Sequence, residues 1–109
     1  MEALQLASAP LVVDGGIALV RATGQFDLFT AKILADALAE ACSRGLSVQL
    51  DMSAVTFMAA SALAVILKAH EKLANRGCSI EIVRSAAVVK RLLRLTDMGW
   101  LERAEPCLN

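Results

Sequence analysis

The spacing of the hydrophobic residues is the feature that most constrains the fold of this chain, because it switches between two periods. Residues 46–53 alternate Val48, Leu50 and Met52 with polar side chains, which is typical of a β-strand with one buried face. Residues 60–76 instead repeat hydrophobic side chains every three or four positions, which predicts a helix. The side chains of this helix that we expect to face inward are Leu63, Ile66, Leu67, His70 and Leu73.

The same two patterns follow once more toward the carboxyl terminus. Residues 78–83 alternate again and predict a strand, with Cys78, Ile80 and Ile82 on one side. Residues 86–99 predict a third helix that ends at Gly99. Its inward side chains are expected to be Val88 or Val89, Leu92, Leu93 and Leu95.

The first part of the chain predicts a hairpin and a helix. Residues 11–24 form two β-stretches joined at Asp14-Gly15-Gly16, since Asp-Gly and Gly-Gly tolerate the positive φ angles of tight hairpins. From about Thr30 to Arg44 the pattern is helical, with Leu34, Leu38, Ala41 and Cys42 on one stripe. The predicted order is β-β-α-β-α-β-α, which favours an α/β fold with helices packed on a sheet.

Length and charge narrow the class of protein. The 109 residues predict one domain over 1–109, with a loose tail at about 103–109. Eleven basic and eleven acidic residues cancel, so the attraction that dominates nucleic-acid binding has no source. The longest uncharged run, residues 52–67, is too short for a spanning helix, and the first ten residues lack a basic signal region. We expect a cytoplasmic protein with no nucleic-acid partner and no membrane insertion.

Residues that could carry chemistry are sparse. Cys42, Cys78 and Cys107 are odd in number and far apart, which favours reduced thiols over a disulfide framework or a zinc site. His70 is the only histidine, and no Gly-rich phosphate loop or acid–base pair is evident. We therefore expect no catalysis, no cofactor and no metal. One helix face is basic and is interpreted as solvated: Lys90, Arg91 and Arg94.

Three segments together resemble one known family. Residues 24–34 read GQFDLFTAKIL, residues 48–83 read VQLDMSAVTFMAASALAVILKAHEKLANRGCSIEIV, and residues 88–101 read VVKRLLRLTDMGWL. Their order and spacing resemble the STAS domain family, best known through bacterial anti-sigma-factor antagonists. The family pattern has a Gly-Glu-Leu-Asp entry into the first helix. It continues with a strand ending in Asp-Leu-Ser, an Asp-Ser-Ser/Thr-Gly turn and a long helix.

The resemblance implies a small mixed β-sheet of about four strands, with three or more helices packed on it and no catalytic activity. It also implies a switch, because in the antagonists a partner kinase of the anti-sigma-factor type phosphorylates the first Ser of the Asp-Ser-Ser turn. Unphosphorylated antagonist binds the anti-sigma factor, and phosphorylated antagonist releases it.

This chain departs from the family turn at three of its four positions. Ala59 stands at the Asp, Ala60 at the acceptor Ser and Ala62 at the Gly, and only Ser61 matches the second Ser or Thr. Phosphorylation needs a hydroxyl oxygen, and Ala60 ends in a methyl group, so we expect the usual switch to be absent. Ser61 is a poor substitute for the acceptor serine. Successive residues on a helix are rotated by about 100° around its axis, so the Ser61 oxygen would point in a different direction from a side chain at position 60.

The resemblance implies a docking surface around this turn, formed by Asp27, Thr56, Met58, Ala59, Ala60, Ser61 and Ala62. The same residues also have purely structural interpretations. The small side chains would let the helix pack closely, and Ser61 would cap the helix or lie in its first turn. Thr56 would be an ordinary residue of the bridge between strand and helix, and Asp27 would stabilise the first helix through its charge.

The expected partner is an anti-sigma factor or a serine-kinase-type regulator, and the sequence is also compatible with a homodimer. The alternative is a STAS-type structural or regulatory subunit of a larger assembly, such as a lipid-transport ABC complex, in which no phospho-acceptor is required. An enzyme or a nucleotide-binding domain is a third alternative, which the lack of a phosphate loop disfavours.

Overall fold

The computed structural model describes residues 7–102, and its elements follow the predicted order. The strands are β1 (Leu11–Asp14), β2 (Ile17–Phe26), β3 (Ser47–Met58) and β4 (Ile80–Ser85). The helices are α1 (Ala31–Ser43), α2 (Ala60–Ala74) and α3 (Ala87–Leu95), followed by a short 3-10 helix, η1 (Gly99–Leu101). The tail expected at 103–109, with Cys107, lies outside the described residues.

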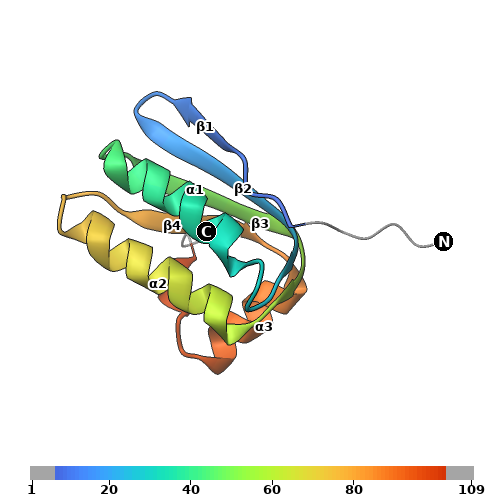
Figure 1. Ribbon diagram of the computed structural model, residues 1–109. Helices are drawn as coiled ribbons and strands as arrows, with labels where there is room; N and C mark the ends of the chain where they lie inside the picture. Colours follow the sequence, from blue (N-terminus) through green and yellow to red (C-terminus); the bar gives the residue numbers. More distant parts are fainter. Residues whose placement is uncertain (1–6, 103–109) are drawn as a thin grey trace, which may run out of the picture.

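Within residues 7–102, the strands form one mixed sheet in the order β1-β2-β3-β4. β1 pairs antiparallel with β2, whereas β3 runs parallel to both β2 and β4. Helices α1 and α2 lie side by side over one face of this sheet (Figure 1). The α/β fold with a small mixed sheet and three helices is therefore confirmed.

The turn between β1 and β2 has the predicted geometry. Asp14 pairs with Ile17, so Gly15 and Gly16 are the two turn residues. Their φ angles are +60° and +81°, a conformation that glycine adopts without a steric penalty. The predicted hairpin is confirmed.

Alternating residues of the strands face the helices and form the core. Val20, Phe26, Leu50 and Met52 are all buried on this face. The helices present the predicted stripes against it: Leu34, Leu38 and Ala41 from α1, and Leu63, Ile66 and Leu73 from α2. His70, expected in the same stripe, is only half-buried, and its ring meets the edge of Trp100 with centroids 4.9 Å apart.

Strand β3 is longer than its alternating pattern predicts. The pattern stops at residue 53, yet the strand continues to Met58 because β2 pairs with it as far as Phe26. Gly24 pairs with Val55 and Gln25 with Phe57, so Thr56 is the extra residue of a bulge. An earlier shift lies where the pattern stops: Arg21 pairs with Asp51 and Thr23 with Ala54, so two residues of β3 oppose one of β2. The two shifts interrupt the period of two, which is why the sequence did not predict this part of the strand.

Helix α3 is shorter than predicted, because it ends at Leu95 rather than at Gly99. The amide of Met98 donates to the carbonyl oxygen of Leu93 at 2.8 Å, and Asp97 between them has a φ of +60°. This arrangement is a Schellman motif, in which Asp97 occupies the left-handed position that usually belongs to glycine. Leu95, predicted to face inward, is 73% exposed, and Gly99 begins η1 instead of ending α3.

Candidate functional site

The candidate site lies where β2 and β3 end. Parallel strands bring their carboxyl ends to the same edge of a sheet, which is where many α/β folds place their binding sites. Phe26, the last residue of β2, pairs with Met58, the last residue of β3. The amide of Ala59 donates to the carbonyl oxygen of Phe26 at 2.8 Å. The loop of residues 27–30 and the start of α2 are therefore held beside each other.

Asp27 and Thr30 fix the shape of the loop after β2. Oδ1 of Asp27 accepts hydrogen bonds from the amides of Phe29 and Thr30, each at 2.9 Å. In return, the Thr30 hydroxyl accepts from the amide of Asp27 at 2.9 Å and lies 2.8 Å from the carbonyl oxygen of Gln25. The hydrogen bonds to the carboxylate, first from the Thr30 amide, then from the Thr30 hydroxyl at 3.0 Å and from the Phe29 amide, hold the pKa of Asp27 below its ordinary value of 3.8. The carboxylate thus acts as a structural anchor at the entry to α1.

Helix α2 begins without help from a side chain. Ala59 is the N-cap residue in an extended conformation, and no hydrogen bond from its side chain or acidic residue in the first turn supports the helix start. Ala60 is the first helical residue and is exposed, while Ser61 follows it and is half-buried. Ser61 therefore lies in the first turn, as one of our interpretations had it, but it is not the N-cap. The side chain that position 60 presents at the surface is therefore a methyl group.

Two of the residues proposed for the docking surface lie in the core instead. Met58 is 4% exposed and Ala62 is fully buried, so neither is available to a partner in this structure. Both occupy inward positions, Met58 at the end of β3 and Ala62 in the first turn of α2. Thr56 is exposed, but it is the bulge residue of β3 rather than part of a bridge between strand and helix. Asp27, Ala59, Ala60 and Ser61 are brought together.

The structure adds large apolar side chains that the sequence analysis missed. Leu28 and Phe29 are 71% and 86% exposed on the loop after β2, and Phe57 is 46% exposed near the end of β3. These three side chains and Ala60 belong to segments that meet where β2 and β3 end, and we call them the loop-end surface. Exposed apolar side chains of this size are uncommon in a cluster and mark interaction sites. The sequence DLFT of residues 27–30 could have indicated this exposure. An Asp that caps the following turn predicts a loop, and Leu28 and Phe29 lie inside that loop.

Among residues 7–102, no three His, Cys, Asp or Glu side chains are grouped so that they could hold a metal ion. The thiols of Cys42 and Cys78 are free. No helix in the described part of the chain has the length and apolar character needed to cross a membrane.

Comparison with known proteins places these observations in a family. The sequence model of one protein family, the STAS domain, matches residues 8–103 of this chain. An anti-sigma factor antagonist from Mycobacterium paratuberculosis has a similar structure, with a TM-score of 0.80 and 22% identity over 94% of this chain and 88% of that chain. The anti-sigma factor antagonist SpoIIAA in its unphosphorylated form gives a TM-score of 0.77 at 14% identity, over 91% of this chain and 90% of that one.

The Bacillus cell fate determinant SpoIIAA in its phosphorylated form is also similar, with a TM-score of 0.70 at 14% identity over 91% of this chain and 93% of that chain. At these identities the likeness to solved structures establishes the fold.

Proposed function

Because this chain belongs to the STAS domain family, we propose that it is a non-catalytic, cytoplasmic protein-binding module of the anti-sigma-factor-antagonist type. It docks through the loop-end surface on an anti-sigma factor or a serine-kinase-type regulator. The observation that carries this proposal is that Ala60, Phe29 and Phe57 are all exposed on segments that meet where β2 and β3 end.

The apolar side chains supply the binding energy in this proposal. Leu28, Phe29 and Phe57 expose large apolar surfaces that a partner would remove from water, at about 25 cal/mol for each Å² buried. The Asp27–Thr30 hydrogen bonds hold the loop in one conformation, which lowers the entropy lost on binding. Asp27 contributes by positioning Leu28 and Phe29 rather than by direct contact.

The missing hydroxyl defines how such a module behaves. Phosphorylation of a serine at position 60 would add about −1.5 to −2 charge beside the exposed aromatic side chains. Ala60 accepts no phosphate, so the loop-end surface keeps one charge state. The module binds its partner whatever the activity of the kinase, in contrast to SpoIIAA, for which phosphorylated and unphosphorylated forms have been solved.

The first test measures binding to purified anti-sigma and serine-kinase-type regulators from the same genome. We expect micromolar or tighter binding by calorimetry, with the affinity lowered at least about 10-fold by the double substitution F29S/F57S, since each ring buries a large apolar area. The double substitution R91A/R94A, which removes two exposed arginines from α3 and leaves the loop-end surface unaltered, serves as the matched control. If no such regulator binds, the proposal is wrong.

The second test restores the acceptor. The chain and its A60S variant are incubated with the partner kinase and ATP, and their intact masses are compared. We expect phosphate on A60S and none on the unaltered chain. Phosphate on Ser61 or Thr56 of the unaltered chain would show that the switch has moved rather than disappeared.

The same absence of an acceptor supports the second candidate function, a structural or regulatory subunit of a larger assembly such as a lipid-transport ABC complex. Such a subunit needs the fold and a docking surface but no phosphorylation. Stable co-purification with an ATPase subunit, with no affinity for anti-sigma factors, would favour this function over the first.

A further inference from the structure

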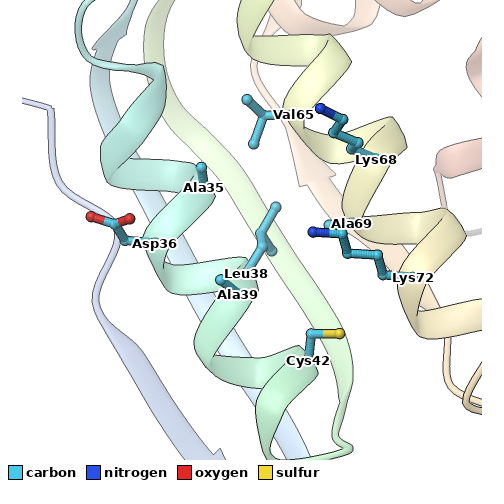
Figure 2. Close-up of a pocket in the computed structure, with 9 residues that line it drawn as sticks. All are labelled: Ala35, Asp36, Leu38, Ala39, Cys42, Val65, Lys68, Ala69 and Lys72. Atoms are coloured by element: carbon cyan, nitrogen blue, oxygen red, sulfur yellow. The ribbon is translucent and has the colours of Figure 1, made fainter.

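Helices α1 and α2 leave a groove between them on the side away from the sheet. The groove has a volume of about 330 Å³. Its lining is small and apolar: Leu38 and Ala69 are buried beneath it, and Ala35 and Val65 are half-buried along it (Figure 2). It starts about one turn beyond the loop-end surface and continues toward Cys42 near the end of α1. A neighbouring helix could approach closely where the lining is small, at Ala35, Ala39 and Ala69.

One wall of the groove carries two lysines that take part in no ion pair among residues 7–102. Lys68 and Lys72 are exposed on α2, and Figure 2 shows both ammonium groups directed across the groove toward α1. None of the ion pairs found within residues 7–102 includes either lysine. Arg76, two residues past the end of α2, donates to the carbonyl oxygen of Cys42 at 2.7 Å.

The carboxylates of α1 are not available to these lysines. Asp36 also lines the groove, but it pairs with Lys32 at 2.8 Å, and Figure 2 shows its carboxylate on the side of α1 away from the two lysines. Glu40 pairs with Arg44, also at 2.8 Å. Both acidic groups are therefore paired within their own helix, and the groove keeps a positive wall.

We propose that the groove between α1 and α2 binds an acidic amphipathic helix of a protein partner. Lys68 and Lys72 are four positions apart, so their charges are spaced by about one helical turn, or about 5.4 Å. Two carboxylates at the same spacing on an aligned helix would face both lysines, and small residues between them would pack on Ala35 and Ala69. The volume is near the lower end of the range for small-molecule sites, about 300–1,000 Å³, and suits a few side chains better than a whole ligand.

The probe for this proposal is a synthetic helical peptide of about 15 residues, rich in alanine, with Glu at two positions four apart. Methyl NMR spectra should show shifts of Ala35, Ala39 and Ala69 on titration. The double substitution K68E/K72E should weaken binding at least tenfold. The double substitution R91E/R94E, which changes the net charge equally on α3, should leave binding unchanged, and added salt should weaken it in the unaltered chain.

Several results would overturn the proposal. The first is equal binding of a control peptide with Gln in place of both Glu residues, which would show that the charges do not contribute. Absence of groove shifts at millimolar peptide, or shifts confined to other surfaces, would exclude the site. Saturable binding of decanoate to the same methyl groups, without peptide binding, would identify a small anion as the occupant. Self-association abolished by K68E/K72E would identify a second copy of this chain.

The groove and the proposed function are tested separately. The double substitution F29S/F57S should bind the acidic peptide as the unaltered chain does, because Phe29 and Phe57 lie outside the groove. If the peptide fails to bind while a regulator still binds the loop-end surface, only the groove proposal is wrong.

Discussion

Ala60 and Ala62 lie two positions apart in the same segment of small residues. The structure predicts that a larger side chain lowers the stability of the protein at position 62 but not at position 60. Ala62 is fully buried in the first turn of α2, whereas Ala60 is exposed. The substitution A62L forces three additional carbon atoms into a packed core. Overpacking of this kind costs about 1–3 kcal/mol, and we take about 2 kcal/mol as the expected loss in the free energy of unfolding.

The loss converts into a measurable fall in Tm. An unfolding entropy of about 2.1 cal/mol/K per residue gives a decrease of about 9 °C for 109 residues. Urea unfolding followed by circular dichroism measures the free energy, and the slope with urea should not change. The matched variant A60L should stay within about 0.5 kcal/mol of the unaltered chain. Equal stability of A62L and the unaltered chain, or an equal loss in A60L, would refute the assignment of Ala62 to the core and Ala60 to the surface.

Three further predictions concern the helix ends and the loop after β2. D97G should raise the free energy of unfolding by about 1 kcal/mol, because glycine adopts the left-handed conformation of residue 97 without strain. Urea unfolding measures this change, and a loss of stability would show that Asp97 is not strained. The pKa of Asp27 is lowered by folding, so its contribution to stability is present above about pH 4 and is lost as the pH falls through the folded-state pKa. D27N should therefore weaken the pH dependence of unfolding below about pH 4, and an unchanged acid titration would refute this. R76A should lower the free energy of unfolding by about 0.5–1 kcal/mol through loss of the bond to the Cys42 carbonyl, while R91A should not.

The sequence by itself determined the order of the elements. Residue spacing is a local property, and hydrophobic periods of two and of three to four are sufficient to locate β2, α1, α2 and β4 to within a few residues. The turn at Gly15 and Gly16 was equally predictable, because its geometry depends on the two residues themselves. The proposal that the phospho-acceptor is missing also came from the sequence, since it requires only the family pattern and the identity of Ala60.

Only the tertiary structure decided which neighbours of Ala60 reach the surface. Met58 and Ala62 belong to the same short segment as Ala60, but the first faces the core from β3 and the second from α2. Strand β3 extends past its alternating pattern because β2, about thirty residues earlier, pairs with it around a bulge. The groove depends likewise on α1 and α2 lying side by side, so Lys68 and Lys72 acquire their setting from residues far away in sequence. Burial and pairing depend on distant segments, and for this reason local patterns could place the elements but not the surface they form.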